Sequence, residues 1–167
     1  MSEIETFQDA WELERLVELF DGFAPVTVLE IGAWHGGTLK QWIGLGRTIV
    51  VVDDEMRKGD EWAEWAEAAH CDLTLLQGSS QDRDLVEKAR ELGPYDFCFI
   101  DADHTYEGVK ADWDNYSPMC DVVALHDIRQ RAGYGVSDLW DEVRPGRKSI
   151  DIWAGELGYC GIGVVWM

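Results

Sequence analysis

Five short apolar runs alternate along the chain with segments of helical periodicity, and this alternation limits the possible folds more than any other feature. The runs are rich in β-branched residues, as in "TIVVVD" at positions 48–53, and are too short to be core helices. Buried strands separated by amphipathic helices predict βαβ units, in which parallel strands lie between two helical layers. The predicted strands are Val26–Gly32, Thr48–Asp53, Leu73–Gly78, Tyr95–Asp101 and Cys120–Asp127.

The segments between and after these runs complete the pattern. Six of them show helical periodicity, and the C-terminal tail adds two β-like segments around a turn near Gly155. We therefore predict an α/β fold, a doubly wound three-layer α/β/α sandwich. The chain contains no linker, so residues 1–167 are expected to form a single domain. The predicted helices are Thr6–Phe20, Gly36–Gly46, Gly59–His70, Asp82–Gly93, Tyr106–Tyr116 and Gly135–Arg144, and the β-like tail segments are Ser149–Trp153 and Tyr159–Met167.

The formal net charge of the chain is −19 at pH 7. Nucleic acids and anionic membranes are bound through clustered Lys and Arg, so we expect neither as a partner. No apolar run approaches the roughly 18 residues that span a bilayer, and the acidic N-terminal stretch lacks the pattern of a signal peptide. We expect a cytoplasmic protein with a solvated acidic surface.

The four cysteines are scattered and form no C-x-x-C pair. We therefore expect free thiols rather than a zinc site or disulfides. Cys98, Cys120 and Cys160 lie inside apolar runs and are predicted to be small core residues.

The first predicted strand runs into a glycine turn, "EIGAWHGG", which contains Gly32, Gly36 and Gly37. A turn of this kind lets the backbone approach a ligand, and the next helix presents free N–H groups to an anion. A dinucleotide site requires G-x-G-x-x-G, but Trp34 occupies the second glycine position. The observed spacing suits a ligand with one small carboxylate, such as S-adenosylmethionine. The alternative is that the glycines only allow tight packing of strand and helix.

Two further loops follow strands of the same predicted sheet. Asp53 lies 21 positions after Gly32, where an acid accepts hydrogen bonds from ribose hydroxyls, and Asp54 is an equivalent candidate if the strand ends one residue later. Ser79 and Ser80 follow the third strand and could border an adenine. They could instead cap the helix that follows, because the spacing is that of a capping box.

The fourth and fifth strands end in residues that can bind metal or move protons. Asp101, His126 and Asp127 are predicted to lie side by side over the crevice, as a site for Mg²⁺ or Mn²⁺. Asp103 either orients a neighbouring residue or binds the metal in place of Asp101. A hydroxyl that attacks an electrophile must lose its proton, and His104 is our first candidate for the general base, with His126 second. Alternatively, His104 caps the next helix, and Asp127 pairs with Arg129 or Arg131.

The motifs "VLEIGAWHGGT", "FIDADHTYEGVKADW" and "LHDI" resemble those of class I S-adenosylmethionine-dependent methyltransferases, in particular a bacterial branch with D-x-D-H-x-Y and a later HD. The resemblance implies a seven-stranded sheet whose last strand is antiparallel. It also implies that Glu30 and Gly32 line the methionine end of the cofactor and that Asp53 binds the ribose. Related metal-assisted enzymes carry acidic ligands at equivalent strand ends, one of which His126 would replace. The complete predicted cofactor-binding set is Glu30, Gly32, Ala33, Trp34, Gly36, Asp53, Asp54, Ser79, Ser80 and Asp101.

This chain departs from the family pattern at two places. The glycine pair that commonly precedes the fifth strand is absent from "YSPMCDVVAL", and Ser79 stands where the family often has an acid after the third strand. The first departure implies a different turn. The second weakens the assignment of the adenine site to this loop.

These features predict a methyltransferase that acts on an oxygen of a small molecule or sugar, with possible metal assistance. The acceptor pocket is expected between the N-terminal helix, the loop Arg129–Tyr134 and the turn around Gly155, and a homo-oligomer is compatible with the sequence. Two rival functions use the same residues: a non-catalytic module that binds S-adenosylmethionine or a nucleoside, and a metal-dependent hydrolase or hydroxylase built on the Asp101, His126 and Asp127 site.

Overall fold

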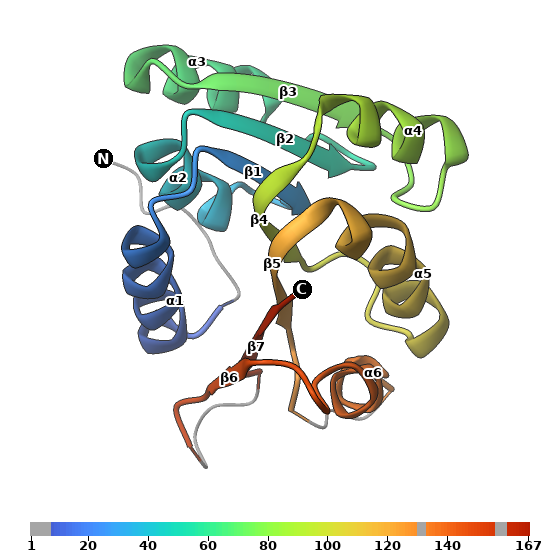
Figure 1. Ribbon diagram of the computed structural model, residues 1–167. Helices are drawn as coiled ribbons and strands as arrows, with labels where there is room; N and C mark the ends of the chain where they lie inside the picture. Colours follow the sequence, from blue (N-terminus) through green and yellow to red (C-terminus); the bar gives the residue numbers. More distant parts are fainter. Residues whose placement is uncertain (1–7, 130–132, 156–159) are drawn as a thin grey trace.

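The computed structural model describes residues 8–129, 133–155 and 160–167, and in these residues the predicted alternation of strands and helices is confirmed (Figure 1). Strand bounds differ from the predicted ones by at most three residues, the strand Thr48–Asp53 matches its prediction at both ends, and every predicted helix is present. The helices are α1 (Ala10–Phe23), α2 (Gly37–Leu45), α3 (Gly59–Ala69), α4 (Arg83–Leu92), α5 (Tyr106–Tyr116), a single 3₁₀ turn η1 (Ser117–Met119) and α6 (Val136–Val143). The strands are β1 (Thr27–Ile31), β2 (Thr48–Asp53), β3 (Asp72–Gln77), β4 (Tyr95–Ile100), β5 (Cys120–His126), β6 (Ser149–Ile152) and β7 (Ile162–Trp166).

These strands form one sheet in the order β3-β2-β1-β4-β5-β7-β6. The first five pair in parallel, whereas β7 is antiparallel to both of its neighbours. The seven-stranded sheet with an antiparallel last strand, which the family resemblance implied, is therefore confirmed.

Helices cover both faces of the sheet, as the doubly wound prediction requires (Figure 1). Side chains of α1, α2 and α3 pack on one face, around the buried Phe20, Trp42 and Trp62. Side chains of α4, α5 and α6 pack on the other face, around Trp113 and Trp140. The inner parallel strands β1, β2, β4 and β5 are thus buried on both sides, which explains why their sequences are nearly continuous apolar runs, whereas the edge strand β3 is only partly buried.

The first helix begins later than its periodicity predicted. Asp9 is the N-cap of α1, because its side chain accepts hydrogen bonds from the main-chain N–H groups of Trp11 and Glu12. The helix predicted from Thr6 therefore starts at Ala10, while Thr6 itself lies outside the described residues. None of the helices in the described ranges is long and apolar enough to cross a membrane.

The order of the strands reverses beside β1, which lies between β2 and β4. The chain first runs outward from β1 to β3 and then returns to β4 on the other side of β1. Ligands of open α/β sheets bind at such a reversal, beyond the carboxyl ends of the strands. The topology therefore brings the glycine turn after β1 next to the polar residues that follow β4.

Gly36 illustrates how closely the helices pack on this sheet. Its φ is +80°, and a Cβ atom added there would lie 2.3 Å from Nε1 of Trp62 in α3. We predict that Gly36→Ala lowers the free energy of unfolding by about 2–5 kcal/mol, because a left-handed residue with a Cβ costs about 1–2 kcal/mol and overpacking costs about 1–3 kcal/mol. Urea denaturation measures this change.

Gly146→Ala is the matched control. Gly146 has a φ of +79° but nothing within 4 Å of an added Cβ, so its substitution should cost only the conformational part, about 1–2 kcal/mol. Equal losses in the two variants would mean that Trp62 does not confine Gly36.

Candidate active site

A cavity of about 1050 Å³ lies over the carboxyl ends of the strands, at the point where the strand order reverses. Its volume is at the upper end of the roughly 300–1,000 Å³ that is typical of small-molecule sites. Most of the residues predicted to bind the cofactor, the metal or the acceptor proton line it. The predicted residues in its wall are Gly32, Trp34, Asp53, Asp54, Ser79, Ser80, Asp101, His104, His126 and Asp127.

Glu30, Ala33 and Gly36 are the three predicted site residues that are not part of the cavity wall. Glu30 is fully buried, and Thr38 of α2 donates a hydrogen bond to its side chain. Burial raises the pKa of Glu30 to about 8, although the Thr38 hydroxyl lowers it. Glu30 therefore lies beneath the cavity, and its contact with the methionine end of a cofactor stays a prediction.

The glycines of the turn allow close packing of the chain against itself. Gly32 has a φ of +83°, and an added Cβ would lie 2.4 Å from the main-chain oxygen of Asp101. Gly36 is confined by Trp62. Both glycines therefore allow close packing, as the alternative interpretation of the turn predicted, and of the two only Gly32 also lines the cavity.

The carboxylate of Asp53 organises this turn. Its Oδ2 accepts hydrogen bonds from the N–H groups of Ala33 and Trp34, and its Oδ1 accepts from those of Glu55 and Met56, over distances of 2.7–3.1 Å. A carboxylate offers about four acceptor positions, so these four donors occupy most of its capacity. Asp54 is exposed beside it in the same wall, and the choice between the two acids for a ribose stays open.

The loop after β3 places both predicted serines in the cavity wall. The alternative that they cap α4 is wrong, because Asp82 is the N-cap and accepts a hydrogen bond from the N–H of Asp84. Ser79 accepts a hydrogen bond from the N–H of Gln81 within the loop itself.

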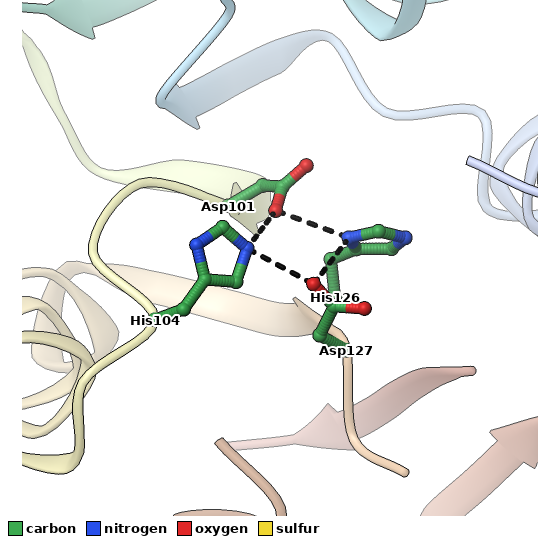
Figure 2. A group of neighbouring side chains, drawn as sticks. All are labelled: Asp101, His104, His126 and Asp127. Atoms are coloured by element: carbon green, nitrogen blue, oxygen red, sulfur yellow. Dashed lines mark hydrogen bonds and ion pairs between the residues drawn. The ribbon is translucent and has the colours of Figure 1, made fainter. Parts of the chain in front are cut away.

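Four side chains from the ends of β4 and β5 meet in one cluster (Figure 2). Nε2 of His104 lies 3.2 Å from Oδ1 of Asp101 and 3.0 Å from Oδ2 of Asp127. Nδ1 of His126 lies 3.1 Å from the same Oδ1 of Asp101 and 3.6 Å from Oδ2 of Asp127. One potential ligand atom from each of the four residues lies within 4.8 Å of all the others. The predicted set Asp101, His126 and Asp127 is therefore brought together, and the structure adds His104.

The members of this cluster shift one another's pKa values. Burial would raise the pKa of Asp101, but the two imidazoles lower it to about 2. Burial would lower the pKa of His104, but its contacts with Asp101 and Asp127 raise it to about 9. Against burial, the same two carboxylates raise the pKa of His126 well above its usual value. The carboxylates therefore increase the proton affinity of both imidazoles.

Accessibility separates the two histidines. The side chain of His104 is 30% exposed and that of His126 only 4%. The alternative that His104 caps α5 is wrong, because Thr105 is the N-cap and accepts a hydrogen bond from the N–H of Gly108. Both candidate bases line the cavity, and His104 is the more accessible of the two.

Asp127 pairs with His104, whereas Arg129, one of the two arginines considered as its partner, pairs with another acid. Arg129 pairs with Asp151 of β6, with 3.1 Å between its guanidinium and the carboxylate. Arg131 lies outside the described residues. Asp127 itself has a φ of +61°, a strained conformation that turns its side chain toward His104.

Gln8, Tyr134 and Cys160 also reach the site, although none of them was predicted individually as a site residue. Nε2 of Gln8, which precedes α1, donates a hydrogen bond of 2.7 Å to Oδ2 of Asp101, and the ring of Tyr134 lies 4.5 Å from that of His104. Cys160, predicted to be a core residue, is half-buried and lines the cavity. Gln8 falls in the predicted N-terminal helix and Tyr134 in the predicted loop, two segments expected to border the acceptor. No sequence signal marks Gln8 individually, because the fold alone brings it to a residue 93 positions away.

The seven-stranded, doubly wound sheet, with its cavity over the strand ends, has the Rossmann-like architecture of methyltransferase domains. The family described as a methyltransferase domain matches residues 29–128, and the chain belongs to that family. The sequence-based identification of a class I S-adenosylmethionine-dependent methyltransferase is thereby confirmed. No curated protein sequence matches the chain significantly.

Several solved structures share the fold. An O-methyltransferase from Bacillus cereus, in complex with S-adenosylhomocysteine, is 17% identical, with a TM-score of 0.73 over 99% of this chain and 84% of that one. TomG from Streptomyces achromogenes, an O-methyltransferase of tomaymycin synthesis in complex with S-adenosylmethionine, is 16% identical, with a TM-score of 0.73 over 100% and 83%. MycE of the mycinamycin pathway, in complex with Mg²⁺ and S-adenosylhomocysteine, is 18% identical, with a TM-score of 0.63 over 92% and 48%.

The four hydrogen bonds of Asp53 predict its effect on stability. Asp53→Ala should lower the free energy of unfolding by about 2–5 kcal/mol, because it leaves N–H groups without acceptors around a buried site. Asp54→Ala, next to it but exposed, should change stability by less than about 0.5 kcal/mol. Urea denaturation compares the two, and similar losses would show that Asp53 does not organise the turn.

Proposed function

We propose that this protein transfers the methyl group of S-adenosylmethionine to an oxygen of a small molecule or sugar. The observation that carries the proposal is the Asp101–His104–His126–Asp127 cluster in the wall of the cavity of a methyltransferase domain. Methyl transfer to oxygen requires a site that accepts the hydroxyl proton close to the methyl donor. The cluster supplies such a site beside the glycine turn.

The cavity fits S-adenosylmethionine in size and in the chemistry of its wall. Gly32 exposes main chain at one side, Asp54 offers a carboxylate for ribose hydroxyls, and Ser80 offers a hydroxyl for a purine edge. Asp53 keeps the glycine turn in shape through its four hydrogen bonds. When bound, S-adenosylmethionine would supply an electrophilic methyl group.

His104 is the proposed general base. It is the more exposed imidazole of the cluster, and two carboxylates orient its ring and raise its proton affinity. The acceptor hydroxyl would give its proton to the neutral form of His104, while Asp101 and Asp127 stabilise the imidazolium that forms. Because these carboxylates raise the pKa of His104 to about 9, the neutral form is the minor one at pH 7, and turnover should rise with pH up to about 9. Tyr134 packs beside the His104 ring, and Cys160 lines the same cavity, so both are placed to contact the acceptor.

The cluster also fits a divalent cation. Two carboxylate oxygens and two imidazole nitrogens within 4.8 Å form a mixed donor set, which suits Mn²⁺ or another transition metal better than Mg²⁺. Asp101, His126 and Asp127 would hold the ion, and the less buried His104 would remain to take the proton. A bound cation would act as a Lewis acid that lowers the pKa of the acceptor hydroxyl.

Cofactor binding and methyl transfer test the proposal together. We expect calorimetry to show binding of S-adenosylmethionine, and a panel of small hydroxylated acceptors, sugars included, to yield S-adenosylhomocysteine and an O-methylated product. Binding without transfer to any acceptor would support a non-catalytic module instead. Turnover of an acceptor in the presence of metal but without S-adenosylmethionine would support a hydrolase or hydroxylase.

His104→Asn should reduce kcat by about 10²-fold or more, the usual contribution of a general base, while the Kd of S-adenosylmethionine stays near that of the wild type. His70→Asn is the matched control. His70 ends α3 in a left-handed conformation that Asn tolerates, and it is exposed outside the cavity wall. Undiminished turnover in His104→Asn would assign the base elsewhere.

Metal binding is tested independently of turnover by titrating the purified protein with Mn²⁺ in a calorimeter. We expect one bound ion, and a loss of at least about tenfold in affinity in Asp101→Asn, because even residues that only orient metal ligands contribute tenfold or more. Asp103→Asn is the control, since the Asp103 carboxylate accepts its hydrogen bonds from Thr105. Equal affinity in all three proteins would exclude this cluster as the metal site.

A further inference from the structure

One face of α5 supports both loops that border the cavity on the side of β3 and β4. Gly108, Asp112 and Tyr116 are spaced four residues apart, so they lie on a single face of the helix, and all three are buried. The phenol of Tyr116 donates a hydrogen bond of 2.7 Å to the main-chain oxygen of Ser80. A Cβ on Gly108 would lie 2.0 Å from Cγ of Asp103, so that side chain folds against the helix at this glycine.

Asp112, in the middle of this face, is a buried acid that the proposed chemistry does not use. It is 0% exposed, and neither carboxylate oxygen makes a hydrogen bond of normal geometry to the described residues. Burial raises its pKa to about 6, while the Ser80 hydroxyl and the main chain of Asp103 are near enough to lower it. Buried polar atoms nearly always have a partner. The neighbouring donors are the main chain of Asp103 and the Ser80 hydroxyl, and of these only the hydroxyl can rotate and also lines the cavity.

The direction of the Ser80 hydroxyl decides what Ser80 offers to the cavity. An ionised carboxylate only accepts hydrogen bonds, whereas a hydroxyl has one hydrogen to donate and two lone pairs. If the Ser80 O–H donates to Asp112, the Ser80 oxygen can only accept a hydrogen bond on its cavity side. Such an oxygen favours a ligand with an N–H at that place and leaves a carbonyl there unpaired.

We propose that Asp112 is a positioning residue that fixes the Ser80 hydroxyl as an acceptor and so makes this site select a purine with an amino group at C6 over one with a carbonyl. The inference rests on the proposed use of S-adenosylmethionine, whose adenine carries that amino group. It assigns to the buried acid a role in cofactor specificity, and to Tyr116 the role of holding the Ser80 main chain in register. Neither residue touches the ligand.

The test compares S-adenosylhomocysteine, whose purine has an amino group at C6 and an unprotonated N1, with S-inosylhomocysteine, whose purine has a carbonyl at C6 and a proton on N1. Calorimetry at pH 8 gives both Kd values for each protein. We expect the wild type to bind the adenosyl compound at least ten times more tightly. In Asp112→Asn, which has nearly the same shape but an NH₂ group that can donate to Ser80, this ratio should fall at least fivefold.

Further variants separate this role from a purely structural one. Ser80→Ala should lower the ratio as Asp112→Asn does, and the double variant should lower it no further, because both act through one hydroxyl. Tyr116→Phe should also lower the ratio. Tyr95→Phe is its matched control, since Tyr95 is equally buried and donates a 2.7 Å hydrogen bond to the main-chain oxygen of Ala89, a residue outside the cavity wall.

The outcomes distinguish the inference from the function on which it rests. A wild-type ratio in both Asp112→Asn and Ser80→Ala, with normal binding of S-adenosylhomocysteine, would overturn the role of Asp112 and leave the methyltransferase proposal intact. Absence of binding of either ligand to the wild-type protein would overturn the proposed cofactor itself. A general loss of stability would weaken the binding of both ligands equally and leave the ratio of their Kd values unchanged. If Asp112→Asn does not fold, the ratio measured for Tyr116→Phe tests the inference instead.

Discussion

The site depends on the close approach of two main-chain segments where β1 and β4 pair at the reversal of the sheet. The Cα of Gly32, directly after β1, lies so close to the main-chain oxygen of Asp101 that a side chain at this position would overlap with it. The N–H of Asp101 also donates a hydrogen bond to the main-chain oxygen of Ile31. This contact places the glycine turn directly beside the carboxylate that bridges both histidines. Without it, the cofactor side and the acceptor side of the cavity would lie apart.

Several carboxylates of this acidic protein are buried, so not all of its negative charge lies on the solvated surface that the sequence predicted. Asp53 shapes the glycine turn through four N–H groups. Glu12 of α1 is fully buried and accepts hydrogen bonds from the N–H groups of Ala154 and Gly161, which follow β6 and precede β7. Because an acid that leaves water needs donors, each of these carboxylates joins segments that are distant in the sequence.

The strand-end cluster combines opposite charges in a small volume that is open on one side. Asp101 contacts both imidazoles, and Asp127, at the end of β5, also lies close to both of them (Figure 2). Such an arrangement can exchange protons or accept a cation, and its partial burial strengthens both interactions. The two imidazoles differ in accessibility, since the side chain of His104 is 30% exposed and that of His126 only 4%.

The sequence by itself determined the class of fold, since apolar runs that alternate with helical periodicity have few other solutions, and it determined that Asp101, His126 and Asp127 would meet, because parallel strands end at the same edge of a sheet. The tertiary structure alone decided that Asp53 binds the glycine turn, that His104 joins the cluster instead of capping α5, and that Gln8, Cys160 and Asp112 lie at or beneath the cavity. The physical reason is range: periodicity and strand ends are local properties of the chain. The donor that a buried carboxylate finds depends instead on which distant segment the packing brings to it.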